Sequence, residues 1–191
     1  MLTLFYSPHA ASVDNEAGRA SGHADVPLSA IGCRQAHVVG RHYAMKALHA
    51  VFCSDLQRAY TTAEIAFSGR GLPIARDARL RECDYDDLTQ CPTTQLEEAL
   101  ARHITEPFPN GQSVVIVAWG VGDFLRHLLR EHDGKTIAVI GHRTTRYGLD
   151  YWCGDASLEE IVRARWEWRD IPVCCYEVNA RDLERRSAEA K

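Results

Sequence analysis

The sequence predicts an α/β protein with a mainly parallel central sheet. Short apolar runs of strand length occur at Leu2–Tyr6, Ala50–Cys53 and Thr136–Ile140, and a late strand is expected at Val173–Val178. Helical patterns lie between these runs, and alternation of strands and helices is typical of this fold class. With 191 residues, of which 46% are hydrophobic, the chain can bury one well-formed core.

Three helices have recognisable start signals. Ser29 is placed to cap a helix that runs to about Met45, and Asp55 to cap one that runs through Ala66. A longer helix is expected from Ser113 to about Glu131, where Asp133-Gly134 stops it.

The rest of the chain is less regular. Residues 69–110 contain three prolines that break any long element: Pro92, Pro107 and Pro109. We expect a single domain over residues 1–178 and a highly charged C-terminal tail over 179–191, either a solvated helix or a frayed end.

Charge and composition narrow the class of protein. The net charge is −4 with acidic and basic residues mixed, which argues against nucleic-acid and membrane-surface partners. No run approaches the roughly 20 apolar residues of a membrane span, and the N-terminal run is too short for a signal peptide. The seven cysteines form no CxxC pair, which favours reduced thiols and a cytoplasmic location. The nine histidines show no metal-ligand spacing, so no metal is expected.

Three polar side chains follow the ends of apolar runs. His9 follows the first run, Arg58 lies just after the run ending at Cys53, and His142 follows the third run. Ligands of open α/β sheets bind at the carboxyl ends of the strands, so these three residues are expected to converge on one crevice. Each histidine alone is more often a surface or core residue, but two in equivalent positions weaken that interpretation.

Other phosphate chemistries fit poorly. Gly134-Lys135-Thr136 precedes its strand where a P-loop follows one, and Leu129 stands where the motif requires glycine. Cys175 and Arg181 have the spacing of a cysteine phosphatase, but the intervening residues lack glycine, include Glu177 and continue a strand pattern.

An ordered series of motifs runs along most of the chain. They are His9 with Ser12 and Asn15, GHADVPLSAIGCRQA (22–36), SDLQRAYTTAEIA (54–66), Leu80-Arg81-Glu82, PNGQS (109–113) and IGH (140–142). On these motifs the chain resembles the histidine phosphatase superfamily, the phosphoglycerate mutase-like enzymes, over about residues 1–178. The resemblance implies a three-layer α/β/α fold and a phosphohistidine mechanism that needs no cofactor.

The resemblance also implies roles for individual residues. His9 attacks phosphorus, and Glu82 protonates the leaving oxygen and then activates water. Arg58 and His142 hold the equatorial phosphate oxygens, while Asn15 and Ser12 contribute to substrate binding. These residue types suit the chemistry, because a neutral imidazole, whose ordinary pKa is about 6.5, is nucleophilic near neutral pH.

Pro8 is the main departure from the family pattern. It stands where the motif has its first phosphate-binding arginine, and proline offers neither a charge nor an amide donor. Arg143 and Arg146 are the two candidates to replace that charge, and both are equally well explained as solvated arginines. Gln112 in place of glutamate is a second, minor departure.

Two functions from different classes follow. The first is a phosphoric monoester hydrolase that acts on a small-molecule phosphate ester. The alternative is a weakened or repurposed family member that binds or transforms a non-phosphate ligand, which the loss of the arginine at position 8 favours. Hydrolysis is favoured over mutase activity because only about 28 residues separate Glu82 from Asn110, leaving little room for a water-excluding insertion. A homodimer is left open.

The leaving group of the substrate is not visible in the sequence. Residues 84–108 are expected to border the pocket, and four side chains there either contact a leaving group or simply pack: Tyr85, Cys91, His103 and Phe108. Trp152, Trp166 and Trp168 form either an aromatic wall or part of the core.

Overall fold

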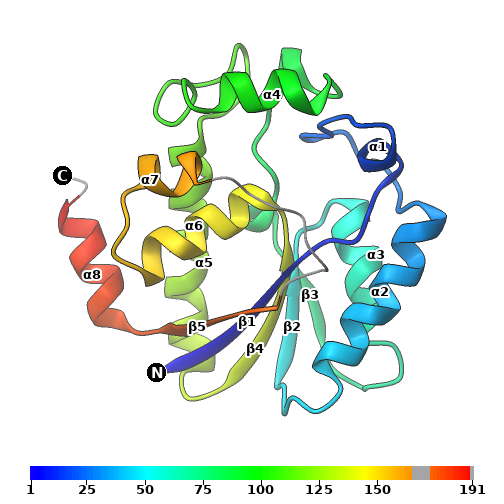
Figure 1. Cartoon of the computed structure of the whole chain (residues 1–191). Helices are drawn as coiled ribbons and strands as arrows, with labels where there is room; N and C mark the ends of the chain where they lie inside the picture. The colour runs from blue at the N-terminus through cyan, green and yellow to red at the C-terminus, as the bar shows by residue number, and fades with distance from the viewer. Residues whose placement is uncertain (165–172, 190–191) are drawn as a thin grey trace.

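A computed structural model describes residues 1–164 and 173–189 of the chain (Figure 1). Within these residues five strands form one sheet in the order β3-β2-β4-β1-β5. The strands are β1 (Leu2–Pro8), β2 (Ala50–Cys53), β3 (Ile74–Arg76), β4 (Thr136–Gly141) and β5 (Cys174–Val178). The β5 strand runs antiparallel to β1, whereas the other neighbouring pairs are parallel. The predicted α/β fold with a mainly parallel sheet is confirmed.

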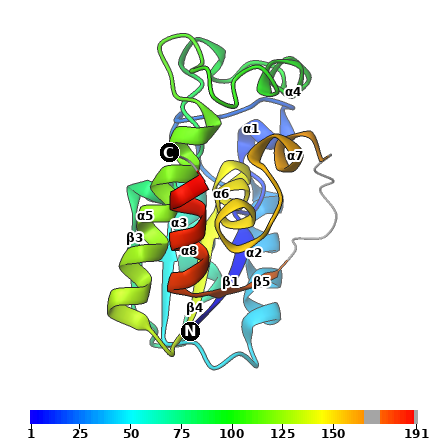
Figure 2. The same ribbon diagram turned by 90° about the vertical axis from the view of Figure 1, so that its left-hand side faces the viewer.

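Helices cover both faces of the sheet (Figures 1 and 2). One face carries α2 (Ala30–Tyr43) and α3 (Gln57–Ala66), and the other carries α5 (Val114–His132), α6 (Arg143–Cys153) and α8 (Ala180–Glu189). The shorter helices are α1 (Val13–Glu16), α4 (Thr93–Leu100) and α7 (Leu158–Arg163). The expected three-layer α/β/α arrangement is therefore present, with α1 and α4 above the carboxyl ends of the strands (Figure 1).

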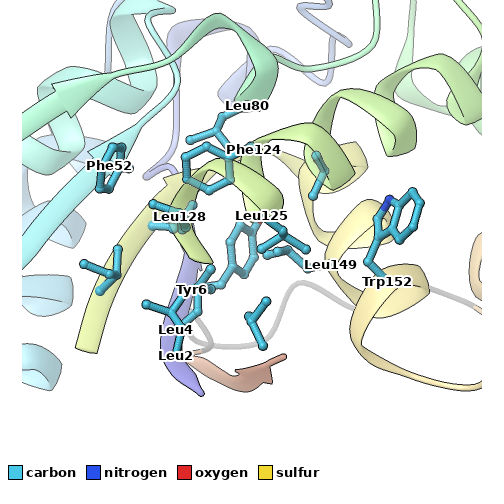
Figure 3. Packing of buried hydrophobic residues seen from close by; sticks show 14 of the residues in the cluster. Leu2, Leu4, Tyr6, Phe52, Leu80, Phe124, Leu125, Leu128, Leu149 and Trp152 are labelled. Carbon is cyan, nitrogen blue, oxygen red and sulfur yellow. The ribbon is translucent and has the colours of Figure 1, made fainter. Parts of the chain in front are cut away.

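The core follows from the two-residue alternation of the strands. In β4, Ile137 and Val139 face α5 and α6, while Ala138 and Ile140 face α2 and α3, and all four are fully buried. Figure 3 shows the larger cluster, in which β1 side chains pack against α5 and α6. Each large apolar side chain buried there contributes roughly 1.5–3 kcal/mol, which fixes the sheet as a rigid platform for the residues at its edge.

The start signals of the helices have different outcomes. Ser29 caps α2 as predicted, since its hydroxyl accepts a hydrogen bond from the amide of Gly32 at 2.9 Å. The prediction that Asp55 caps α3 is wrong, because Leu56 is the N-cap residue. Both carboxylate oxygens of Asp55 instead accept bonds from the Arg81 guanidinium, at 2.7 and 2.6 Å. Two charge-assisted hydrogen bonds to Arg81 stabilise Asp55 more than one capping hydrogen bond to a helix amide would.

The C-terminal segment is not the solvated helix or frayed end expected from its charge. It forms α8, whose Leu183 is buried in the core cluster. Arg186 is also buried, and one guanidinium nitrogen donates to the carbonyls of Gly154 and Ala156, at 2.7 and 2.9 Å. The three-residue spacing of Leu183 and Arg186 places both on one helix face, so an apparently charged tail packs against the domain.

Candidate active site

The sheet opens at its carboxyl edge onto a cavity of about 910 Å³. Three of the residues that line it are His9, Arg58 and Glu82. His9 directly follows β1, Arg58 lies in the first turn of α3, and Glu82 follows the 3-10 turn Ala78–Leu80. Arg143 and Glu97, from α6 and α4, line it farther out. Residues from distant parts of the sequence therefore meet at the predicted crevice.

His9 is held in one tautomer. Arg58 Nε donates to His9 Nε2 at 3.3 Å, so Nε2 carries a lone pair, and Nδ1 donates to the Ala10 carbonyl at 2.7 Å. Burial, and then the charge of Arg58, lower the pKa of His9 to about 3. The side chain is therefore a neutral imidazole whose Nε2 keeps its lone pair, which at present accepts a hydrogen bond from Arg58, and this is the nucleophilic form.

His142 lies opposite His9, with the two ring centroids 4.9 Å apart. Its main chain is fixed on both sides: Tyr6 donates its hydroxyl to the His142 carbonyl at 2.6 Å, and the His142 amide donates to Thr145 Oγ1 at 2.9 Å. Burial, followed by the charge of Arg58, lowers the pKa of His142 well below its ordinary value. Neither ring nitrogen has a hydrogen-bond partner in the described part of the chain, so His142 has unused polar atoms.

Arg58 is the buried cation of the site. Its two terminal nitrogens donate to the carbonyls of Gly22 and Ala24, at 2.8 and 3.0 Å, while Nε reaches His9. Only 2% of the residue is exposed. The loop at 22–24 therefore positions a permanently charged guanidinium beside the imidazole.

Glu82 is fixed by three donors to one carboxylate oxygen, the weakest of which is the Thr144 amide at 3.4 Å. The amide of Cys83 donates to Oε1 at 2.9 Å, and the hydroxyl of the fully buried Thr144 donates to the same atom. His23 holds the main chain, because its Nε2 donates to the Glu82 carbonyl at 2.8 Å, with Nδ1 3.5 Å from Asp84 Oδ2. The carboxyl group thus reaches the cavity from a fixed backbone.

The sequence alone assigned no role to His23 or Thr144, which hold the main chain and the carboxylate of Glu82. His23 stands inside the GHADVPL segment and Thr144 two residues after His142, so both lie within or beside recognised motifs. That position was the available signal for both residues.

Ser12 and Asn15 form a reciprocal cap on α1. The Asn15 amide donates to Ser12 Oγ at 3.2 Å, and the Ser12 amide and hydroxyl both donate to Asn15 Oδ1 at 3.0 Å. Asn15 lines the cavity, whereas Ser12 is fully buried behind it. The geometry gives Asn15 direct access to a ligand and gives Ser12 the task of orienting Asn15.

Arg143 and Arg146 have different surroundings. Arg143 lines the cavity and forms an ion pair with Glu97, whereas Arg146 is not among the residues around the cavity. The Arg146 Nε lies 3.2 Å from an oxygen of Asp150, one helical turn further along α6. Burial lowers the pKa of Arg143, but nearby Tyr85, Tyr147 and acidic groups outweigh it and raise the pKa above its ordinary value. Of the two arginines, only Arg143 borders the site.

Pro8 is the last residue of β1 and is buried. It pairs with Gly141 of the neighbouring strand β4. The position expected to carry an arginine therefore supplies neither a charge nor an amide donor at the end of β1, directly before His9.

Residues 84–108 border the cavity only in part. Tyr85 lines the cavity. Phe108 is buried in the cluster under α4, where His103 stacks on it with the ring centroids 4.1 Å apart. Cys91 packs against the same cluster. Four further residues that line the cavity here are Thr93, Thr94, Leu96 and Glu97, all on α4.

The aromatic residues near the later strands are partly described. Trp152 belongs to the core, where its indole nitrogen donates to the Ala118 carbonyl at 2.6 Å. Trp166 and Trp168 lie outside the described residues. Among residues 1–164 and 173–189, no group of three His, Cys, Asp or Glu side chains is arranged to hold a metal ion. Within the same ranges, no helix has the length and apolar character of a membrane span.

Two facing imidazoles, a guanidinium and a carboxyl group at the carboxyl edge of a three-layer sheet define the class of phosphoglycerate mutase-like domains. Comparison with family models leads to the same class, with a match over residues 7–186 to the histidine phosphatase superfamily, branch 1. The chain belongs to that superfamily.

Relatives of known name include mutases and phosphatases. The chain is 35% identical over 96 residues to the probable phosphoglycerate mutase GpmB of Yersinia enterocolitica, a match that covers 50% of this chain and 45% of the mutase. It is 28% identical over 150 residues to phosphoserine phosphatase 1 of Hydrogenobacter thermophilus, covering 74% and 71% of the two chains. The matched segment thus spans less than half of the mutase.

Solved structures have the same fold. YhfR of Bacillus stearothermophilus superposes with a TM-score of 0.81 and 25% identity, covering 94% of this chain and 93% of the other. A mycobacterial glucosyl-3-phosphoglycerate phosphatase superposes with a TM-score of 0.76 and 22% identity, covering 84% and 85%. The second likeness concerns the fold alone.

Proposed function

We propose that this protein is a phosphatase that hydrolyses a small phosphomonoester through a phosphohistidine on His9. One observation carries the proposal: a neutral imidazole, held in a single tautomer by Arg58 and the Ala10 carbonyl, lines a cavity, and its ring centroid lies 4.9 Å from that of a second, fully buried imidazole. A neutral nitrogen nucleophile beside an imidazole with unused polar atoms suits attack on an anionic phosphoryl group.

The reaction has two displacement steps. His9 Nε2 attacks phosphorus, an N–P bond forms, the ester P–O bond breaks, and the leaving oxygen takes a proton from the Glu82 carboxyl group. Water then attacks the phosphohistidine, giving a proton to Glu82 as the N–P bond breaks and inorganic phosphate forms. The hydrogen bonds from Cys83 and Thr144 to Glu82 Oε1 support this role, because they fix the carboxyl group that must serve both steps.

Three further residues would bind the phosphoryl group. Arg58 and His142 provide donors for the equatorial oxygens, where negative charge accumulates, and Asn15 provides a neutral donor. Their position around His9 supports this assignment. No cofactor takes part in these steps.

Hydrolysis is proposed over mutase activity. Between Glu82 and Asn110 the chain contributes little regular structure beyond α4 and one 3-10 turn, Asp86–Leu88. The cavity keeps a volume of about 910 Å³. Such a site admits water to the phosphohistidine, and water is what turns phosphoryl transfer into hydrolysis.

Pro8 supports the competing proposal, a weakened or repurposed member of the family. A charge-assisted hydrogen bond contributes about 1.5–3 kcal/mol, so the missing arginine weakens transition-state binding by about ten- to a hundredfold for each bond lost. The intact set of His9, Glu82, Arg58 and His142 favours the phosphatase, since a binding protein needs neither a nucleophile nor an acid.

Hydrolysis of a chromogenic aryl phosphate tests the proposal. The wild-type protein is expected to show slow but measurable turnover and an acid-labile phosphoryl group on His9, both lost in His9→Ala. Wild-type turnover no faster than buffer, with activity appearing only in Pro8→Arg, would instead support the repurposed member. Gel filtration with light scattering tests the homodimer, which stays a prediction.

A further inference from the structure

Arg143 is placed at a strand end next to the one that lacks its arginine. Pro8 ends β1 and pairs with Gly141 of β4, and Arg143 follows Gly141 by two residues as the first residue of α6. The positive charge absent from the end of β1 is therefore present at the adjacent strand end, on the border of the same cavity.

Among residues 1–164 and 173–189, three arginines line the cavity, and their partners differ. Arg58 is held by main-chain carbonyls. Arg19 makes two bonds, at 2.9 and 2.7 Å, to Asp14, a carboxylate that is 1% exposed and also accepts a bond from Gln90. Both of these guanidinium groups are fixed by buried partners.

The acidic partner of Arg143 is of another kind, although the guanidinium also has a side-chain hydrogen bond with the buried Tyr85. Glu97 lies on α4, and its side chain is 58% exposed, whereas that of Arg143 is 12% exposed. When the pair opens, water can solvate the exposed Glu97 carboxylate, so the cost on that side is about that of an exposed pair, about 0.2–1 kcal/mol. The buried guanidinium, in contrast, still needs an anion. The Arg143 guanidinium can therefore exchange this carboxylate for a stronger anion.

We propose that Arg143 is the phosphate-binding cation that replaces the arginine missing at position 8, and that Glu97 occupies it until a phosphoryl group displaces the carboxylate. The inference deepens the proposed phosphatase function and rests on it. A phosphomonoester carries about −1.5 to −2 charge near neutral pH and accepts two parallel bonds from a guanidinium, so it outcompetes a single exposed carboxylate. The substrate class that this exchange selects is the dianionic monoester over the singly charged diester.

Isothermal titration with inorganic phosphate tests the exchange directly. Arg143→Met is expected to raise the Kd by about ten- to a hundredfold, and Arg143→Lys by less, because lysine keeps the charge but loses the planar fork. Glu97→Gln removes the competing charge and is expected to lower the Kd by about two- to fivefold. The matched control is Glu64→Gln, a 53%-exposed carboxylate paired with Arg76 outside the cavity, which should leave the Kd unchanged.

A double-mutant cycle identifies the atoms involved. In the Arg143→Met background, Glu97→Gln is expected to leave the Kd for phosphate unchanged, because the guanidinium for which Glu97 and phosphate compete is absent. A Kd in Arg143→Met within twofold of wild type, or weaker phosphate binding in Glu97→Gln, overturns the inference. Because Glu97→Gln predicts a gain, misfolding cannot imitate the expected result.

The two proposals fail separately. Arg143-dependent phosphate binding without aryl phosphate turnover would reject the phosphatase and support the role of Arg143. Turnover that is unaffected by Arg143→Met would support the phosphatase and reject the role of Arg143.

Discussion

The buried His9 imidazole makes the stability of the fold depend on pH. Burial, together with the charge of Arg58, lowers its pKa from an ordinary value of 6.5 to about 3 in the folded state. Below pH 6.5 the unfolded chain therefore binds more protons at this position than the folded chain, so acid favours unfolding. Each pH unit below 6.5 removes about 1.4 kcal/mol, which is about 2 kcal/mol at pH 5, and the loss continues to about pH 3.

Urea unfolding of wild type and His9→Gln at pH 7.5 and pH 5.0 measures this contribution. Glutamine does not titrate, so the free energy of unfolding should fall by about 2 kcal/mol less in the variant than in wild type between the two pH values. Carboxylates and His142 titrate in both proteins, so their contributions largely cancel in the comparison. An equal fall in both proteins would refute a neutral, buried His9 and with it the assigned nucleophile.

Three other predictions follow from contacts near the site. Thr144→Val removes a hydroxyl donor from the Glu82 carboxylate and should lower kcat about tenfold with the phosphate Kd unchanged, because one charged hydrogen bond is lost; an unchanged kcat would contradict this. His23→Ala removes the hydrogen bond to the Glu82 carbonyl and should also lower kcat about tenfold, because a displaced carboxyl group transfers its proton more slowly. A change in the phosphate Kd alone would argue against a role of His23 in positioning Glu82. Gly32→Ala places a Cβ 1.9 Å from a backbone carbonyl and should cost about 3 kcal/mol in thermal unfolding. Gly120→Ala, whose nearest neighbour is 3.6 Å away, is its control, and equal stabilities would count against the predicted clash.

The fold was accessible from the sequence because its strands are short, apolar and buried. Runs such as Thr136–Ile140 have side chains in the core on both faces, so their composition alone marks them as strands. The β3 strand was missed because Ile74–Arg76 is short, edge-placed and partly exposed, and it carries no apolar run.

The site residues that directly follow strand ends could be predicted from the sequence. Those whose place in the site depends on contacts between distant segments could not. His9, Arg58 and His142 were placed together by topology, and the structure brings them together. Arg143 and Arg146 lie three residues apart on one helix, so spacing did not separate them. The acidic residue four positions after Arg146 was a usable signal, whereas the contact between Arg143 and α4 spans 46 residues and left no local trace.

The short loop at 22–24 has a consequence for how the pocket can change. The carbonyls of Gly22 and Ala24 accept hydrogen bonds from the Arg58 guanidinium. His23, which lies between them in the sequence, donates a hydrogen bond to the main-chain carbonyl of Glu82. A displacement of this loop would move both the Arg58 guanidinium, which is proposed to bind the phosphate, and the Glu82 carboxyl group, which is proposed to transfer the proton. Variants selected for a new leaving group should therefore accumulate changes on α4, which lines the same cavity but holds neither Arg58 nor Glu82 in place.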